Sequence, residues 1–136
     1  MITHMEKYRN IGIKLTPQRL AILNYMDGNK SHPSADTIYS AVSKKFPTMS
    51  VATVYNTLEA LKNKGALQEL TIESGKKRYD PDTSSHHHLI CIKCKDIIDI
   101  FKKFKLDLSD GMANGFEIKG NHIEFYGICP KCSKLH

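Results

Sequence analysis

Hydrophobic residues recur three and four positions apart in three segments near the start of the chain, which is the spacing of amphipathic helices. The first segment opens with Thr-Pro, where Thr16 can cap a helix and Pro17 suits its first position. The second begins after another capping residue, Ser34, and its buried face would hold Ile38, Tyr39 and Val42. Residues 27–32, DGNKSH, interrupt the pattern. Two short helices are therefore predicted.

The third segment, VATVYNTLEALKNKG, predicts a helix that Ser50 caps and Gly65 ends. Its apolar face would hold Val51, Val54, Leu58 and Leu61. The opposite face carries small or hydrogen-bonding side chains that could lie against base edges in a DNA major groove, namely Thr53, Asn56, Thr57, Ala60 and Lys64. The alternative is an ordinary solvated face, although such faces more often carry long Lys and Glu side chains.

Residues 66–72 and 76–80 read as two strands joined by Glu-Ser-Gly, which predicts a β-hairpin with a basic second arm. Three helices followed by such a hairpin form a winged helix-turn-helix, in which the third helix enters the major groove and the hairpin touches the DNA backbone. The predicted base contacts are Thr53, Tyr55 and Asn56. The predicted phosphate contacts are Arg19, Lys62, Lys64, Lys76 and Lys77.

The charge of the chain is unevenly distributed. Residues 1–79 carry 12 Lys and Arg against 6 Asp and Glu, whereas residues 80–136 carry 8 of each kind. A basic first half indicates a nucleic-acid partner, with a generic basic surface as the alternative. The polar segment PDTSS, residues 81–85, is the predicted linker between a DNA-binding domain, 1–80, and a second domain, 86–136.

The second domain is predicted to be a small α+β unit. HHHLICI and IIDIF read as strands, and residues 102–114, with Leu106, Leu108 and Met112, as a helix. FEIKGNHIEFYGIC reads as a hairpin that turns at residues 119–121. The predicted fold class is thus α+β, a winged-helix domain followed by an α+β dimerisation domain. A unit of this size has a thin core and commonly needs a metal or a partner.

Composition favours a soluble protein without a membrane segment. The hydrophobic fraction is 40% and the charged fraction 25% of 136 residues, as in globular proteins. No apolar run approaches the roughly 20 residues that span a bilayer, and the polar start MITHMEKYRN has no signal-peptide core. We expect a cytoplasmic protein.

The four cysteines form two Cys-x-x-Cys pairs, Cys91 with Cys94 and Cys129 with Cys132, with 34 residues between the pairs. In a cytosolic chain this pattern predicts a metal site before it predicts disulfides. Four thiolates would close a tetrahedral Zn²⁺ site that has no open position and is therefore structural. The alternative is two reduced thiol pairs without metal.

Three consecutive histidines precede the first cysteine pair. Because side chains alternate along a strand, His86 and His88 share one face while His87 shares the other with Cys91. His86 and His88 therefore predict a second metal site, which carboxylate ligands would suit to Fe²⁺ or Mn²⁺. A polar strand end is the alternative. The residues alone leave open which further ligands take part: His32, Asp80, Asp82, Asp96 or Asp99.

The chain resembles the ferric uptake regulator (Fur) family over nearly its whole length. The segments that carry the resemblance are LTPQR (15–19), HPSADTIY (32–39), FPTMSVATVYNTL (46–58), RYD (78–80), HHHLICIKC (86–94), DIID (96–99) and YGICPKC (126–132). The resemblance implies a homodimeric, metal-dependent repressor, and a two-fold dimer predicts a palindromic operator in double-stranded DNA. It implies structural zinc on Cys91, Cys94, Cys129 and Cys132. It implies a regulatory metal on His32, Asp80, His86, His88 and Asp99.

Three features resemble the peroxide-responsive branch of that family: Asp99 in place of Glu, Asp80 after the Arg-Tyr of the hairpin, and VYN at 54–56. This branch implies that hydrogen peroxide reacts at Fe²⁺ in the regulatory site, that His32 or His86 gains an oxygen, and that the metal and then the DNA are released. Mn²⁺ would support DNA binding with little reactivity towards peroxide. A repressor that senses iron or zinc by simple occupancy is the alternative.

An enzyme is not expected. His122-Ile-Glu124 and Cys129-Pro-Lys-Cys132 superficially match the H-x-E and P-C-x-x-C segments of zinc deaminases. The four residues between Glu124 and Cys129 are too few for the intervening elements, and the proline lies inside the cysteine pair. A redox-active thiol protein is a further alternative. No third metal site is predicted at His122, and His87 is predicted to lie on the surface.

Overall fold

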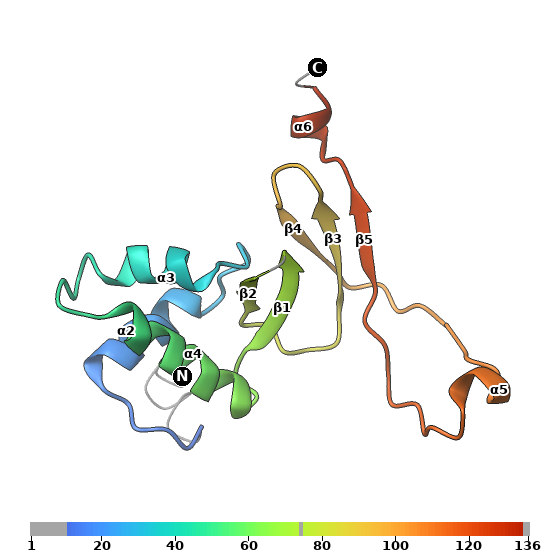
Figure 1. Ribbon diagram of the computed structural model, residues 1–136, viewed down its shortest axis with the longest axis horizontal. Coiled ribbons are helices and arrows are strands. Elements are labelled where there is room, and N and C mark those ends of the chain that lie inside the picture. Colours follow the sequence, from blue (N-terminus) through green and yellow to red (C-terminus); the bar gives the residue numbers. More distant parts are fainter. Residues whose placement is uncertain (1–10, 74, 135–136) are drawn as a thin grey trace. The chain divides into compact units, whose positions relative to one another are not determined.

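The structure is a computed structural model that describes residues 11–73 and 75–134 of the chain. The chain divides into two compact units, Met1–Thr83 and Ser84–His136, and the division falls within the predicted linker. Figure 1 shows the helices and strands of both units. In the part of the chain that is described, no helix has the length and apolar character needed to cross a membrane.

Among residues 11–73, three helices form the body of the first unit: α2 (Pro17–Met26), α3 (Ala35–Val42) and α4 (Val51–Asn63). All three begin at the predicted caps. The side-chain oxygens of Thr16, Ser34 and Ser50 accept hydrogen bonds from the backbone N–H groups three residues later, at 3.2, 3.3 and 3.1 Å. Each such cap contributes about 1 kcal/mol. The helix boundaries expected from the sequence are confirmed.

The core of the first unit lies between these helices. Its largest fully buried side chains are Ile22, Met26, Ile38, Leu58 and Leu61, none more than 1% exposed. Two residues of α4 differ from the prediction. Thr57 is buried rather than facing outwards, and its hydroxyl donates to the Thr53 carbonyl at 2.8 Å, which satisfies the polar group inside the core. Val51, predicted to be buried, is 39% exposed because it lies at the first turn of the helix.

A β-hairpin completes the first unit, as the sequence predicted. Strand β1 (Gln68–Glu73) pairs antiparallel with β2 (Lys76–Asp80). Strand β2 is also joined to the loop before α3, because the Tyr79 N–H donates to the Pro33 carbonyl at 2.9 Å. Three helices and this hairpin give the predicted winged-helix architecture.

The second unit is built on a three-stranded sheet in the order β4-β3-β5. Strand β3 (His87–Cys91) pairs antiparallel with β4 (Ile97–Ile100) and parallel with β5 (Glu124–Gly127). Figure 1 shows β3 between its two partners. Two single-turn helices, α5 (Asp110–Ala113) and α6 (Pro130–Ser133), complete the unit. The mixed helix and sheet content agrees with the predicted α+β class.

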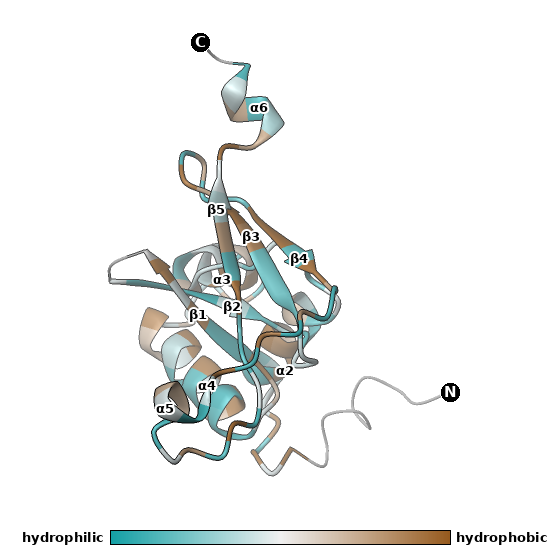
Figure 2. Cartoon of the chain, turned by 90° about the vertical axis from the view of Figure 1, so that its right-hand side faces the viewer, coloured by the Kyte–Doolittle hydropathy of each residue, from teal (hydrophilic) through white to brown (hydrophobic). Residues whose placement is uncertain are grey.

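Two predictions for the second unit are wrong. The helix expected over 102–114 is only the short α5, because Leu106 and Leu108 are 60% and 54% exposed and have no surface in this unit to pack against. The hairpin expected over 116–129 is a single strand, β5, whose partner is β3. Alternation marks a strand but does not identify its neighbour. Figure 2 shows hydrophobic residues on the strands and along the connection into α5.

Candidate metal centres and nucleic-acid interface

The four cysteines of the second unit come together. Cys91 ends β3, Cys94 lies in the turn that follows, and Cys129 caps α6, which contains Cys132. Their Sγ atoms lie within 4.8 Å of one another, and Cys94 Sγ is 3.8 Å from Cys129 Sγ. A tetrahedron with Zn–S bonds of about 2.3 Å has S–S edges of about 3.8 Å. The spacing therefore suits a structural zinc site, as predicted.

The surroundings of the thiols perturb their pKa values in opposite directions. The backbone N–H of Cys129, whose nitrogen is 3.4 Å from Cys91 Sγ, is the main cause that lowers the pKa of Cys91 to about 6. The neighbouring Cys129 sulfur is the main cause that raises the pKa of Cys132 to about 12. The thiolate form of Cys91 is therefore favoured, whereas a second negative charge at Cys132 is disfavoured. A bound divalent cation would remove that conflict and deprotonate all four thiols.

In the first unit, His32 and Asp80 form a pair of possible metal ligands. His32 lies in the loop before α3, and Asp80 is the last residue of β2. His32 Nε2 is 3.3 Å from Asp80 Oδ2. The other carboxylate oxygen of Asp80 accepts the Asp82 N–H at 2.9 Å, which fixes the orientation of the carboxylate. An imidazole nitrogen and a carboxylate oxygen in this arrangement are ligands for Fe²⁺ or Mn²⁺.

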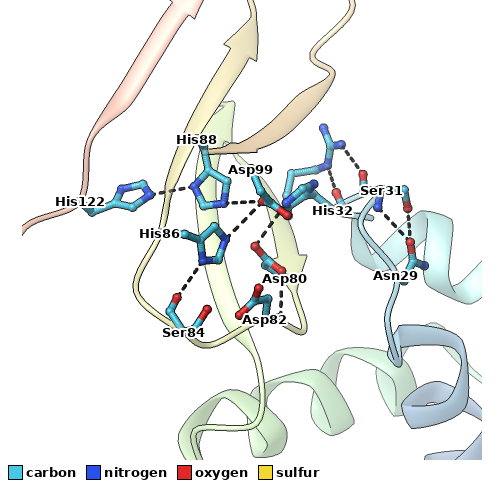
Figure 3. A network of polar contacts seen from close by, with 11 residues as sticks. Asn29, Ser31, His32, Asp80, Asp82, Ser84, His86, His88, Asp99 and His122 are labelled. Atoms are coloured by element: carbon cyan, nitrogen blue, oxygen red, sulfur yellow. Dashed lines mark hydrogen bonds and ion pairs between the residues drawn. The ribbon is translucent and has the colours of Figure 1, made fainter. Parts of the chain in front are cut away.

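In the second unit, three of the predicted ligands meet. His88 on β3 lies opposite Asp99 on β4 in the strand register. Asp99 Oδ1 is 3.3 Å from His86 Nε2 and 3.4 Å from His88 Nε2 (Figure 3). Asp96, another candidate, lies in the turn between the two strands, where its backbone carbonyl accepts the Cys91 N–H.

The proton positions at His86 favour a cation beside Asp99. His86 Nδ1 is 2.7 Å from the Ser84 carbonyl oxygen, so this nitrogen must donate. In a neutral imidazole the other nitrogen, Nε2, then carries a lone pair directed at an Asp99 oxygen that also carries one. Either a proton or a metal ion has to separate the two. The donor set therefore fits a divalent metal held by His86, His88 and Asp99.

His122 is a residue whose role the sequence did not reveal. Its Nε2 is 2.8 Å from His88 Nδ1, and Figure 3 shows His88 between Asp99 and His122. Burial, together with the neighbouring histidines, lowers the pKa of His122, so the ring is neutral near pH 7 and can accept the Nδ1–H of His88. Metal-binding histidines commonly have such a partner, which orients the ring. Residue 122 lies beside His88 because β5, which begins two residues later, pairs parallel with β3.

The same pairing explains why the prediction for His87 is wrong. His87 is only 5% exposed, rather than lying on the surface. Its Nδ1 accepts the Ile123 N–H at 2.9 Å, and its ring contacts Phe104 with centroids 5.3 Å apart. Both partners come from segments far along the chain. Alternation along β3 correctly separated His87 from His86 and His88, but it could not show what covers that face.

The predicted DNA-binding face lies on the first unit. Tyr55 and Asn56 of α4 are exposed, and Lys76 and Lys77 of the hairpin border the same groove, whose volume is about 450 Å³. Asp36 and Glu59 also line this groove, so it is not uniformly basic. Thr53 hydrogen bonds with Ser50 through their hydroxyl oxygens, 2.9 Å apart. The helix and hairpin thus present the aromatic, amide and ammonium groups that base and phosphate contacts use.

Three of the predicted phosphate contacts already have partners within the first unit. Lys62 Nζ and Lys77 Nζ each lie 3.2 Å from a carboxylate oxygen of Glu69. Burial alone would raise the pKa of Glu69, but the hydrogen bonds from the two lysines outweigh it and the pKa is lowered. Arg19 donates to the Lys14 carbonyl at 3.0 Å. Lys64 caps the end of α4 and is exposed, as is Lys76.

Comparison with known proteins identifies relatives of this chain. Peroxide operon regulator of Bacillus subtilis (strain 168) is 43% identical over 133 residues, which cover 96% of this chain and 91% of that protein. Peroxide-responsive repressor PerR of Staphylococcus epidermidis is 42% identical over 129 residues, covering 93% and 85%.

Solved structures give the same result. The ferric uptake regulator from Francisella tularensis with iron is similar with a TM-score of 0.71 at 26% identity, covering 90% of this chain and 96% of that one. PerR from Streptococcus pyogenes, described as a structural basis for peroxide sensing and gene regulation, is similar with a TM-score of 0.52 at 35% identity, covering 94% and 89%.

The family model described as "Ferric uptake regulator family" matches residues 10–126. The resemblance seen in the sequence, including its likeness to the peroxide-responsive branch, is therefore confirmed. The chain belongs to the ferric uptake regulator family, and it is a metal-responsive transcriptional regulator and not an enzyme.

Proposed function

We propose that this protein is a homodimeric repressor that binds a palindromic operator while metal is bound and releases it when hydrogen peroxide oxidises His32 or His86. The observation that carries the proposal is the geometry around Asp99, where two imidazole nitrogens face one carboxylate oxygen at 3.3 and 3.4 Å. The relatives named for peroxide response support the choice of signal.

One Fe²⁺ or Mn²⁺ ion would be held by ligands from both units. His32 and Asp80 come from the first unit, and His86, His88 and Asp99 from the second. A metal that takes both sets ties the DNA-binding unit to the dimerisation unit in one arrangement, and its loss frees them. DNA binding would depend on the metal for this reason.

The zinc site would have a structural role. Cys91 and Cys94 follow β3, and Cys129 and Cys132 lie near the end of the chain, so one Zn²⁺ ion joins the two ends of the second unit. A unit of this size gains much of its folding free energy from such a site. Thiolates that are all bound to zinc are not available as the redox sensor.

A second copy of this chain would cover the exposed apolar residues of the second unit. Leu89, Ile98 and Phe125, all on the sheet, are 39%, 51% and 40% exposed, and Phe101, Phe116 and Ile118 are at least 53% exposed. Leu89 lies opposite both Ile98 and Phe125 in the strand register, and adjacent exposed apolar residues mark an interaction surface. A homodimer would place two α4 helices on two half-sites, and a protein that binds operator DNA would work in the cytoplasm.

The proposed chemistry is a two-electron oxidation of an imidazole ring. If Fe²⁺ were bound at this site, it would supply the one-electron chemistry that activates hydrogen peroxide. The ring carbon loses its C–H bond and gains one oxygen, one hydrogen moves to another ring position or to water, and the peroxide leaves as one molecule of water. The Ser84 carbonyl holds the His86 ring in place during this change. An oxidised ring would be a poorer ligand, so these residues would hold the metal less tightly.

A repressor that senses iron or zinc by occupancy is the second candidate. It is favoured by the similarity to the ferric uptake regulator from Francisella tularensis with iron, which has a TM-score of 0.71 at 26% identity. The higher identity to peroxide-responsive relatives favours the first candidate.

DNA release distinguishes the two candidates. The zinc-containing protein is loaded without oxygen with Fe²⁺ or Mn²⁺ and bound to a DNA fragment selected from genomic DNA by the Mn²⁺ form. Equimolar hydrogen peroxide is expected to release the Fe²⁺ form and to leave the Mn²⁺ form bound. Release of neither form by peroxide, with release of both by a chelator, would favour the occupancy sensor.

A further inference from the structure

His32 has an unusual backbone conformation. Its φ is +52°, and within residues 11–73 and 75–134 only Lys95 and Asn114 are other non-glycine residues with positive φ. This region is unfavourable for residues with a Cβ, and it persists only where the surroundings enforce it. The loop that carries His32 must therefore be held by contacts from elsewhere in the first unit.

Arg78 of β2 supplies these contacts. Its Nε donates to the His32 carbonyl oxygen, and its Nη2 donates to the Ser31 carbonyl oxygen at 3.3 Å. The flanking backbone is joined as well, because the Tyr79 N–H donates to the Pro33 carbonyl at 2.9 Å and Ser34 forms a β-bridge with Arg78. One guanidinium thus spans two consecutive carbonyl groups, which a planar fork of donors can do and a single ammonium cannot.

We propose that Arg78 is a positioning residue for the regulatory metal, because it holds the loop that carries His32 against β2. Strand β2 belongs to the β1–β2 hairpin, which is the wing of the DNA-binding unit. The inference rests on the proposed function, in which His32 and Asp80 are metal ligands. Asp80 lies two residues after Arg78 in the same strand, so both ligands of the first unit depend on β2. Lys76 and Lys77 lie on the other side of Arg78 in this strand.

This arrangement makes metal binding and the conformation of the wing one equilibrium. A metal that holds His32 and Asp80 also favours the β2 conformation in which Arg78 reaches the loop. Coupling free energies are reciprocal, so DNA that favours the same wing conformation raises metal affinity. Loss of His32 as a ligand would then change the conformation of β2 at Lys76 and Lys77, because Arg78 joins the His32 loop to that strand. Helix α4 would not change.

The electrostatic effect of Arg78 has the opposite sign and so provides a test. A positive charge near a divalent cation weakens its binding, and removing the charge alone would raise metal affinity. The positioning role predicts that removing Arg78 lowers metal affinity. Lys30, two residues before His32 in the sequence, offers a matched change of charge, and among the described residues it forms no hydrogen bond with the loop carbonyls.

The experiment measures Mn²⁺ binding to the zinc-containing protein by the electron paramagnetic resonance signal of free Mn²⁺. Arg78→Gln is expected to weaken binding about tenfold or more, since two charge-assisted hydrogen bonds are lost. Arg78→Lys keeps the charge but not the fork, and should weaken binding to an intermediate extent. Lys30→Gln should bind as wild type or slightly more tightly. Mn²⁺ affinity of Arg78→Gln within twofold of wild type would overturn the inference.

Two further measurements keep the outcome interpretable. His32→Ala tests the proposed function separately: if it binds Mn²⁺ as tightly as wild type, His32 is not a ligand and the proposed site is wrong, whatever Arg78 does. Hydrogen exchange of the wild-type protein needs no variant. Mn²⁺ is expected to slow exchange of the Tyr79 amide together with that of the loop before α3. Slowing in the loop with none at Tyr79 would contradict a coupling through β2.

Discussion

Glu69 determines how many lysines are available to DNA phosphates. Its carboxylate lies 3.2 Å from both Lys62 Nζ and Lys77 Nζ, and its side chain is 15% exposed, so the two ion pairs are partly shielded from solvent. Affinity for DNA falls as the salt concentration rises, and each lysine that contacts a phosphate adds about 0.9 to the magnitude of the slope of log affinity against log salt concentration. We expect Lys76→Gln to lower that slope by about 0.9 per subunit, and Lys77→Gln by much less.

The reciprocal variant removes the carboxylate. Glu69→Gln frees Lys77 and leaves Lys62 with its 3.5 Å ion pair to Glu59, so the slope should rise by about 0.9 to 1.8 per subunit. The assay is fluorescence anisotropy of a labelled operator fragment with the Mn²⁺ form, titrated from about 50 to 200 mM KCl. Glu59→Gln is the matched control, because Glu59 forms a longer ion pair with Lys62, at 3.5 Å, and its side chain is more exposed, at 53%. The reasoning fails if Lys76→Gln and Lys77→Gln lower the slope equally while Glu69→Gln leaves it unchanged.

Four further outcomes are expected. Because the pKa of Glu69 is lowered in the folded state, its ion pairs stabilise the protein above pH 4.5, and this stabilisation disappears as the pH falls further. The free energy of unfolding of Glu69→Gln should therefore fall less steeply with acid than that of the wild type. His122→Ala should weaken Mn²⁺ binding about 10–100-fold with zinc content unchanged, measured by elemental analysis and titration. Cys132→Ser should lose zinc and unfold the second unit at lower temperature in calorimetry. Thr57→Val should leave operator affinity unchanged and cost about 1 kcal/mol of unfolding free energy in urea.

The parts of the fold that the sequence predicts well are those determined by local chemistry. Thr16, Ser34 and Ser50 begin helices because a short side-chain oxygen satisfies a free N–H nearby. Two Cys-x-x-Cys pairs in one chain are typical of a zinc site, so the sequence also predicts that the four cysteines come together. The ligands that the family resemblance implied, rather than local chemistry, also lie within contact distance inside each unit: His32 with Asp80, and His86 and His88 with Asp99.

The features that the sequence did not predict depend on contacts between distant segments. Thr57 is the exception, since a hydrogen bond to Thr53, one turn earlier in the same helix, lets its hydroxyl face the core rather than solvent. His87 and His122 are placed by the parallel pairing of β5 with β3, which no periodicity reveals. The failed helix over 102–114 has the opposite cause, since its apolar residues remain exposed and find nothing in this unit to pack against.

The central claim is that hydrogen peroxide is sensed at a histidine of the regulatory site, and peptide mass spectrometry tests it most directly. The zinc-containing protein is loaded without oxygen with Fe²⁺ or with Mn²⁺, treated with a small excess of hydrogen peroxide, digested and mapped. We predict one added oxygen on His32 or His86 in the Fe²⁺ sample alone. Intact histidines in both samples, with metal-dependent operator binding retained, would contradict peroxide sensing and leave a repressor that responds to metal occupancy.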